Sequence, residues 1–268
     1  MAAVLFATLA LVLAPQGQIR EDAYHSRALG GTLPFAVYLP PGYDFSQERY
    51  PVVYFLHGLP ASPYAYRGIA FIASALDRLR RPAIVIAPRG ARDGDSDPEY
   101  LDWGPGRNWE TAISSELPRY VDSHYRTIAT RDGRALVGIS AGGYGAVLLA
   151  IHHLSDFSVV ESWSGYFQPT NPAGTVVIPH TPSQSAHNLV PKLEADERKR
   201  PTFFAFYVGA GDKRFRAENE QLDRELRAAG IPHVFRVYPG AHAQSVWQAH
   251  ARPWLALALD HLAAPSQQ

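Results

Sequence analysis

The chain has no cysteine and no excess of charge of either sign. Its 268 residues include 25 Lys and Arg, which balance 25 Asp and Glu. The absence of cysteine excludes disulfide bonds, thiolate metal ligands and a cysteine nucleophile. Because the charges balance, there is no excess of positive charge that would favour binding of a polyanion. We therefore expect no nucleic-acid partner.

Long apolar runs are also scarce, with one exception at the N-terminus. Residues 1–14 are continuously apolar, and Pro15 and polar residues follow. This length suits a signal-peptide core better than a membrane span, which needs about 20 residues. Because no positive charge precedes the run, a weak signal, the end of a membrane anchor and a hydrophobic helix all stay open. We expect a secreted or cell-envelope protein with membrane association through this run, and a cytoplasmic protein is the alternative.

The rest of the chain predicts a single domain of the α/β class. Hydrophobic residues make up 46% of the sequence and charged residues 19%, as in an ordinary globular protein with a sizeable core. From residue 33, apolar runs alternate with helical patterns, which favours a mostly parallel sheet with helices on both faces. We expect residues 1–20 to form a hydrophobic segment and residues 21–268 to form the domain.

Individual elements follow from the same alternation. The expected strands cover 35–39, 52–56, 83–87, 135–139, 158–163, 203–208 and 234–238. The expected helices cover 65–79, 110–124, 143–153, 217–229 and 245–262. Pro118 predicts a late start or a kink in the second helix. Two irregular stretches, 89–108 and 166–200, predict long loops at the edge of the sheet where ligands bind.

One pentapeptide carries the strongest catalytic signal. Gly138-Ile-Ser-Ala-Gly142 follows the apolar run 134–138 and precedes the small-residue helical pattern 143–150. In this strand–turn–helix context, G-x-S-x-G marks a sharp turn that exposes a serine at the end of a parallel strand. The glycines remove Cβ atoms that would clash in so tight a turn. We therefore predict that Ser140 is a nucleophile, with a chance glycine–serine turn as the alternative.

Two later loops supply the base and the acid that a nucleophilic serine needs. Strand 203–208 runs into Gly-Ala-Gly-Asp212, and strand 234–238 runs into Pro-Gly-Ala-His242. The order serine, acid, histidine is the one that accompanies G-x-S-x-G on a parallel sheet. Since each residue follows a strand by a few positions, we expect Ser140, Asp212 and His242 to converge as a catalytic triad.

Other histidines and acids compete for these roles. Glu218 and Asp223 lie on a predicted helix, where solvent exposure is the default, and a loop-capping role for Asp212 is a further alternative. His242 has the strand–loop–helix position that a base needs. The competing histidines end or begin elements, or lie in helices and loops: His57, His152, His153, His180, His187, His233 and His250.

The substrate oxyanion needs hydrogen-bond donors already in place. One predicted donor is the amide of Ala141, the residue after the nucleophile. The second is the amide of Gly58 or Leu59, with Leu59 favoured, because strand 52–56 runs directly into this loop. We interpret the adjacent His57 as a brace for the loop.

Four segments together resemble one family. They are His57-Gly58, Trp-Gly-Pro-Gly-Arg-Asn-Trp-Glu-Thr at 103–111, Ser-Glu-Leu-Pro at 115–118 and Gly-Ile-Ser-Ala-Gly-Gly at 138–143. This combination resembles the esterase D family, which includes S-formylglutathione hydrolases, feruloyl esterases and mycolyltransferases, and it covers residues 33–262. The resemblance implies an α/β-hydrolase fold, a serine triad, and action on carboxylic esters without a metal or an organic cofactor.

We therefore predict a serine esterase that works through an acyl-enzyme. Its 108–118 segment most resembles mycolyltransferases, so acyl transfer to a sugar or lipid alcohol is the first alternative. Mycolyltransferases carry a glutamate as the triad acid, whereas the loop of Asp212 resembles the esterase branch. A non-catalytic binding module is the second alternative, and the intact triad order argues against it.

Aromatic residues on predicted loops indicate a small-molecule ester with an aromatic or lipidic acyl group. They are Tyr64, Tyr66, Tyr100, Trp103, Tyr166 and Phe167. We take His57, Trp103 and Tyr166 as the candidate substrate-binding residues.

Overall fold

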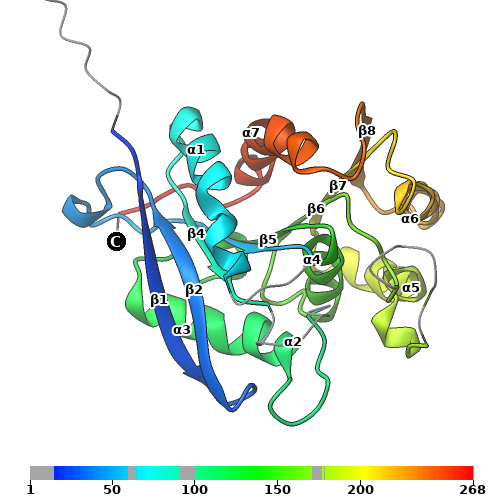
Figure 1. Cartoon of the computed structure of the whole chain (residues 1–268), viewed down its shortest axis with the longest axis horizontal. Coiled ribbons are helices and arrows are strands. Elements are labelled where there is room, and N and C mark those ends of the chain that lie inside the picture. The colour runs from blue at the N-terminus through cyan, green and yellow to red at the C-terminus, as the bar shows by residue number, and fades with distance from the viewer. Residues whose placement is uncertain (1–14, 60–63, 91–99, 171–176, 178, 268) are drawn as a thin grey trace, which may run out of the picture.

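The computed structural model describes residues 15–59, 64–90, 100–170, 177 and 179–267. In this part of the chain, eight strands form one sheet in the order β1-β2-β4-β3-β5-β6-β7-β8 (Figure 1). The strands from β4 to β8 pair in parallel, whereas β1–β2 and β2–β4 are antiparallel. The strand bounds are β1 Gln18–Ser26, β2 Gly31–Leu39, β3 Val52–Leu56, β4 Ile84–Pro88, β5 Arg134–Ile139, β6 Val159–Trp163, β7 Phe203–Gly209 and β8 His233–Tyr238.

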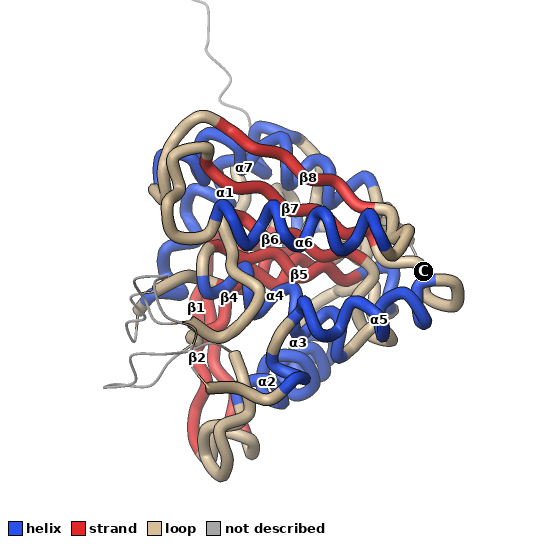
Figure 2. The backbone as a smooth tube through the Cα atoms, turned by 90° about the vertical axis from the view of Figure 1, so that its right-hand side faces the viewer, coloured by secondary structure: helices blue, strands red, loops and turns tan. Residues whose placement is uncertain are grey.

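Helices cover both faces of the sheet, as the alternating pattern predicts. They are α1 Ala70–Leu79, α2 Trp109–Thr111, α3 Leu117–His124, α4 Ala141–His152, α5 Ala186–Glu197, α6 Arg216–Ala228 and α7 Gln244–Asp260. Helices α1 and α7 lie on one face, and α3, α4 and α6 lie on the other (Figures 1 and 2). None of the helices among the described residues is long and apolar enough to cross a membrane.

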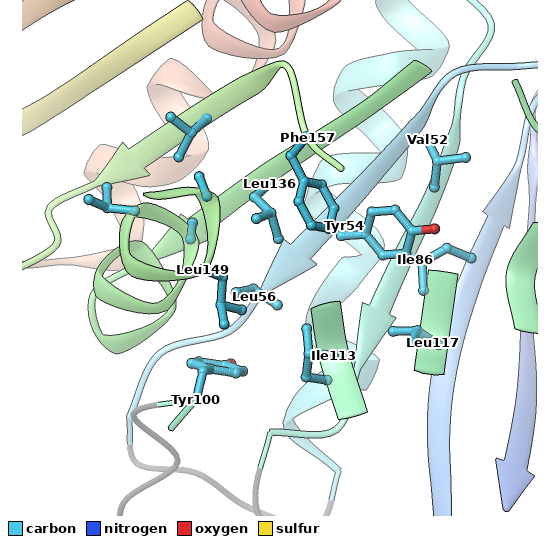
Figure 3. Close-up of a cluster of buried hydrophobic side chains, with 14 of the residues drawn as sticks. Val52, Tyr54, Leu56, Ile86, Tyr100, Ile113, Leu117, Leu136, Leu149 and Phe157 are labelled. Atoms are coloured by element: carbon cyan, nitrogen blue, oxygen red, sulfur yellow. The ribbon is translucent and has the colours of Figure 1, made fainter. Parts of the chain in front are cut away.

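The core has two layers because the central strands are apolar on both faces. Strands β3 and β4 are buried along their whole length. Figure 3 shows Tyr54 of β3 and Ile86 of β4 in the layer toward α4, together with Phe157. The neighbouring residues Val53 and Val85 point into the opposite layer, against α1 and α7. This rigid centre fixes the strand ends that carry the candidate site.

Strand β1 is an element that the apolar pattern did not predict. Its residues are mostly polar and exposed, because it is an edge strand that pairs only with β2. Charged side chains on an edge strand protect it from pairing with other chains. The strand begins at Gln18, so residues 18–20 belong to the sheet and not to the predicted hydrophobic segment 1–20.

The helix expected over 110–124 is interrupted. After α2 comes a π-helical turn, Ala112–Glu116, and then α3, with Pro118 in its first turn. The Leu117 N–H donates to the Ala112 carbonyl, which is the wider spacing of a π-bulge. Because proline has no N–H to donate, the ordinary helical ladder cannot continue through this turn.

The prediction of a long loop over 166–200 is wrong in its second half. Helix α5 occupies this region and buries Val190 and Leu193 against the core. Its three buried residues, Ala186, Val190 and Leu193, do have helical spacing, but the prolines and charged residues of this stretch favoured a loop. Residues 171–176 and 178 of the same stretch, and 91–99 of the expected loop 89–108, lie outside the described residues.

Candidate active site

Ser140 lies in a sharp turn between β5 and α4. Its backbone has φ 53° and ψ −120°, a strained conformation for a residue with a side chain. The turn is stabilised by a hydrogen bond from the Ser140 N–H to the Trp163 carbonyl, 3.0 Å long. A Cβ on Gly138 would lie 2.0 Å from the Gly142 carbonyl oxygen, and one on Gly142 would lie 2.0 Å from the Leu56 oxygen. Glycine is therefore required at both positions.

The three residues predicted to form a triad come together. His242 Nε2 is 2.9 Å from Ser140 Oγ, and His242 Nδ1 is 2.8 Å from Asp212 Oδ2. Each ring nitrogen thus has one partner, which lets the imidazole accept the serine proton on one side while the carboxylate orients it on the other. These residues are separated by up to 102 positions in the sequence.

Asp212 is held in place from its other side. Its side chain is fully buried, and Oδ1 accepts hydrogen bonds from the Arg214 N–H (3.0 Å) and the Phe215 N–H (3.2 Å). One carboxylate oxygen is therefore anchored to the backbone at the start of α6, and the other is left for His242. Backbone donors of this kind stabilise the ionised carboxylate.

The loops that carry Asp212 and His242 are tied to each other. The Ala210 N–H donates to the Tyr238 carbonyl, and the Gly211 N–H donates to the Gly240 carbonyl at 2.7 Å. Gly240 has φ 122°, a backbone conformation that favours glycine. These bonds extend the β7–β8 pairing into the loops and hold the backbones of the acid and the base side by side.

Two aromatic rings flank the imidazole of His242. Phe215 lies 5.1 Å away and Trp247 lies 5.2 Å away between ring centroids, both with their planes nearly perpendicular to the imidazole. Neither residue was predicted from the sequence. Their only signal was a short spacing from Asp212 and from His242, three and five positions respectively. They shield the His242 ring and limit its rotation.

The predicted oxyanion loop lies against the nucleophile. A Cβ on Gly58 would be 2.9 Å from Ser140 Cβ and 3.5 Å from Ser140 Oγ. The Ala141 amide belongs to the first turn of α4, beside the same serine. Leu59 packs against the apolar cluster that includes Ala141. The structure thus places Gly58 and Ala141 next to Ser140, and Leu59 against the apolar cluster that contains Ala141.

His57 is buried, and both of its ring nitrogens have backbone partners. Nε2 accepts a hydrogen bond from the Gly90 N–H at 2.9 Å, and Nδ1 lies 3.0 Å from the Gly58 carbonyl oxygen. Burial lowers the pKa of His57, and the Gly58 carbonyl only partly opposes this. The ring therefore has no nitrogen left for a substrate, and this geometry favours the brace over the substrate contact.

The other two candidate substrate-binding residues occupy different environments. Tyr166 is buried and stacks on Tyr144 at 5.0 Å, and it also contacts Phe215 at 5.0 Å, which places it one residue away from His242. Trp103 is 38% exposed on a turn closed by the bond from its N–H to the Arg107 carbonyl. Of the remaining aromatic residues predicted on loops, Tyr66, Tyr100 and Phe167 are buried, whereas Tyr64 is exposed.

The competing acids have other partners. Glu218 accepts the Phe167 N–H at 2.7 Å and faces His187, which also contacts Glu225. Asp223 pairs with Arg227 and His233. Both acids therefore tie α6 to neighbouring segments and lie away from His242.

A second serine–histidine–carboxylate group lies near the C-terminal end of α4. Glu110 contacts His152 Nδ1 (2.8 Å) and His153 Nε2 (3.0 Å), and Ser114 Oγ is 3.0 Å from the same His153 Nε2. One nitrogen cannot both accept a serine proton and be oriented by the carboxylate, so this group has no relay. Burial alone would raise the pKa of Glu110, but the two imidazoles lower it to about 2.

Within the described ranges, no cluster of three or more His, Cys, Asp or Glu side chains could hold a metal ion. The site consists of a serine on a strand–helix turn, a buried Asp–His pair on the next loops, and a glycine loop beside the serine. Together with the eight-stranded, mostly parallel sheet, this arrangement defines an α/β-hydrolase fold, as the sequence predicted.

Comparison with known proteins identifies the family. Residues 26–253 match the family described as "Putative esterase", and the chain belongs to that family. The resemblance to the esterase D group is thereby confirmed. Esterase Rv1288 of Mycobacterium tuberculosis is 28% identical over 249 residues, covering 82% of this chain and 54% of that protein. Mycolyltransferase Ag85A of Mycobacterium leprae is 33% identical over 138 residues, covering 48% of this chain and 40% of that protein.

A solved structure of a ferulic acid esterase has the same fold. It superimposes with a TM-score of 0.81 at 24% identity, covering 92% of this chain and 98% of that one. The chain spans about half the length of the curated relatives it matches. Family membership supports action on carboxylic esters.

Proposed function

We propose that this chain is a serine esterase that hydrolyses carboxylic esters through an acyl-enzyme. The observation that carries the proposal is the position of His242, with one ring nitrogen 2.9 Å from Ser140 Oγ and the other 2.8 Å from Asp212. A structural histidine would not need both contacts at a strained serine turn. Membership of an esterase family supports the same conclusion.

In the proposed reaction, His242 Nε2 takes the Ser140 hydroxyl proton as Oγ attacks the ester carbonyl carbon. The amides of Ala141 and Leu59 stabilise the oxyanion of the tetrahedral intermediate, with Gly58 as the alternative donor. The imidazolium then gives its proton to the departing alcohol, and the C–O bond of the ester breaks. Water, deprotonated by His242, attacks the acyl carbon and releases the acid and Ser140.

An apolar cluster beside the nucleophile supports an aromatic or lipidic acyl group. It contains Ala141 together with Leu101, Tyr144, Leu148, Tyr166 and Phe215, and Leu59 packs against it. Aromatic walls stack on planar acyl groups and also accommodate alkyl chains. We propose that Tyr166 acts through this wall and that Trp103 binds at the rim.

Acyl transfer to an alcohol is the second candidate. The 33% identity to mycolyltransferase Ag85A over 138 residues favours it. The chemistry differs only in the final step, where a sugar or lipid alcohol replaces water. Addition of alcohol acceptors during turnover distinguishes the two, because a transferase diverts the acyl group to the alcohol and an esterase releases mostly acid.

The N-terminal segment supports a proposal about location. We propose that residues 1–14 direct export or hold the protein at the cell envelope, and that the sheet and its helices form one domain after it. N-terminal sequencing of the protein recovered from a membrane or extracellular fraction tests this. Recovery of the protein only from the cytoplasm would contradict it.

Hydrolysis of p-nitrophenyl esters tests the proposed activity. Ser140→Ala should lower kcat about 10⁶-fold, because the nucleophile and its relay are lost together. Ser158→Ala is a matched control, since Ser158 is also buried but its hydroxyl has no partner in the described structure. It should retain full activity. Equal activity of Ser140→Ala and the wild-type chain would rule the proposal out.

A further inference from the structure

The loop that follows β3 is fixed by two buried side chains. Neither belongs to the triad or to the apolar cluster proposed to contact the acyl group. His57 and Tyr100 each bond to a backbone carbonyl in this loop. The loop contains the peptide that carries the proposed Leu59 donor. The inference below therefore rests on the proposed function and concerns how its oxyanion site is oriented.

The partners of His57 determine its tautomer. The Gly90 N–H can only donate, so the Nε2 atom that it reaches at 2.9 Å must carry a lone pair. The proton of the neutral ring is therefore on Nδ1, from which it donates to the Gly58 carbonyl at 3.0 Å. Burial lowers the pKa of His57 and so preserves this neutral form.

A hydrogen bond to the Gly58 carbonyl also orients the next amide. In a planar trans peptide, the carbonyl of one residue and the N–H of the next point in opposite directions. With its oxygen held by the His57 ring, the Gly58–Leu59 peptide turns its N–H to the other side. A flipped peptide would instead direct a carbonyl dipole at the oxyanion and repel it.

Tyr100 fixes the preceding peptide in the same way. It is fully buried, and its hydroxyl donates to the His57 carbonyl at 2.8 Å. Its ring fills the space over α4, where a Cβ on Gly145 would lie 2.4 Å from the ring. Figure 3 shows Tyr100 below Leu56 and Leu149, near the end of β3. The backbone of Tyr100 itself is strained, with φ 55°.

We infer that His57 and Tyr100 are positioning residues that hold two consecutive peptides of this loop with the Leu59 N–H directed toward the substrate oxyanion. Each peptide is fixed through its carbonyl, by Tyr100 at residue 57 and by His57 at residue 58. The oxyanion site is thus formed before substrate binds.

Substitution of Tyr100 separates positioning from a general loss of stability. Tyr100→Phe removes one hydroxyl, and Tyr24→Phe is the matched control, because the Tyr24 hydroxyl also donates to a buried carbonyl, that of Ala112 at 2.9 Å, far from the loop. We expect Tyr100→Phe to lower kcat about 10- to 100-fold with KM unchanged. The inhibition constant of a trifluoromethyl ketone, which forms an oxyanion on the enzyme, should rise by the same factor. Tyr24→Phe should alter neither quantity.

A second measurement does not require activity. Long-range ¹⁵N NMR of the imidazoles should show the neutral His57 ring as the Nδ1–H tautomer in the wild-type protein at pH 8. His57→Ala, which removes the donor to the Gly58 carbonyl, should reproduce the kinetic effect if Tyr100→Phe does not fold.

These results separate the inference from the proposed function. If Ser140→Ala abolishes hydrolysis but Tyr100→Phe behaves like Tyr24→Phe, the positioning role is wrong while the esterase remains. If the wild-type protein does not hydrolyse esters, the proposed function fails, and the NMR result alone decides the His57 geometry. An Nε2–H tautomer of the neutral His57 ring would overturn the inference in either case.

Discussion

Single residues at this site are held in conformations that cost free energy. Ser140 has a positive φ without being a glycine, and such strain costs about 1–3 kcal/mol. The surrounding glycines and the bond to the Trp163 carbonyl maintain this conformation. In this conformation the Ser140 hydroxyl projects from the end of β5 toward His242. It lies at the N-terminus of α4, whose dipole favours negative charge.

Asp212→Asn should inactivate the protein without unfolding it. The Asn oxygen can still accept the two backbone N–H groups that Asp212 Oδ1 accepts, so its amide nitrogen would face His242 Nδ1. An N–H in this position forces the wrong imidazole tautomer, and kcat should fall about 10⁴-fold. Steady-state kinetics measure this loss, with circular dichroism as the check on folding. A loss below tenfold would mean that Asp212 is not the acid.

The residues of the proposed triad could be predicted because each follows a strand in a recognisable pattern. Phe215 and Trp247 could not, since an aromatic residue a few positions after a turn is usually part of a core. Tyr100 is similar: it was predicted on a loop near the substrate, but its burial against Gly145 depends on the packing of α4. Contacts between distant segments have no signal in one sequence.

At the scale of elements, α5 and α6 are joined by a half-buried histidine, His187, between two acids. His187 Nδ1 lies 2.6 Å from Glu225, and Nε2 lies 3.4 Å from Glu218. Glu218 also accepts the Phe167 N–H next to the aromatic wall. The sequence pattern predicted a loop where α5 lies, so this junction was not predicted. It links α5 to the segment that follows Tyr166 of the proposed aromatic wall.

The stability that this junction contributes should decrease with rising pH. Burial lowers the pKa of His187, but Glu218 and Glu225 more than offset this and raise it above its usual value. A raised histidine pKa adds stability below the unfolded-state pKa of about 6.5 that is lost as pH rises through the folded-state pKa. His187→Gln should therefore be less stable than the wild-type chain at pH 6, with a smaller difference at pH 9.

Thermal unfolding at the two pH values tests this prediction. His25→Gln is the control, because His25 is exposed on the edge strand β1 and should give the same difference at both values. If the loss of thermal stability in His187→Gln is the same at pH 6 and pH 9, the charged contact of His187 with Glu218 and Glu225 does not form.

At the scale of the whole molecule, one acid lies in the middle of the sheet. Glu161 is fully buried in β6, between Val137 of β5 and Ala205 of β7. Trp163 Nε1 donates to one of its oxygens at 3.0 Å. Burial raises the pKa of Glu161 well above its usual value, and this bond only partly opposes the rise. Over a range of pH above about 4.5, Glu161 is therefore protonated in the folded protein but ionised in the unfolded chain.

The stability of the wild-type protein should fall as pH rises because of Glu161, and Glu161→Gln should abolish this fall. A raised carboxyl pKa means that the folded state binds more protons than the unfolded state above about pH 4.5, so the stability of the wild-type chain falls as pH rises. Glutamine can accept from Trp163 but cannot ionise. The stability of the variant relative to wild type should increase from pH 5 to pH 8 in urea unfolding, whereas the exposed control Glu194→Gln should show no such trend.

The class of fold was predictable from the sequence because buried parallel strands are apolar along their whole length. The edge strand β1 and helix α5 were not, because their residues face solvent on most sides. Glu161 is the opposite case, a charged residue type inside a buried strand. Its environment follows from the position of β6 between β5 and β7, which the sequence alone does not define.

Covalent labelling tests the central claim most directly. The intact protein, treated with a fluorophosphonate and digested for mass spectrometry, should carry one equivalent of label on Ser140. The label should be absent from Ser140→Ala and slow to form on His242→Ala. A chain that hydrolyses esters while Ser140 stays unlabelled, or that carries the label on another serine, would contradict the account.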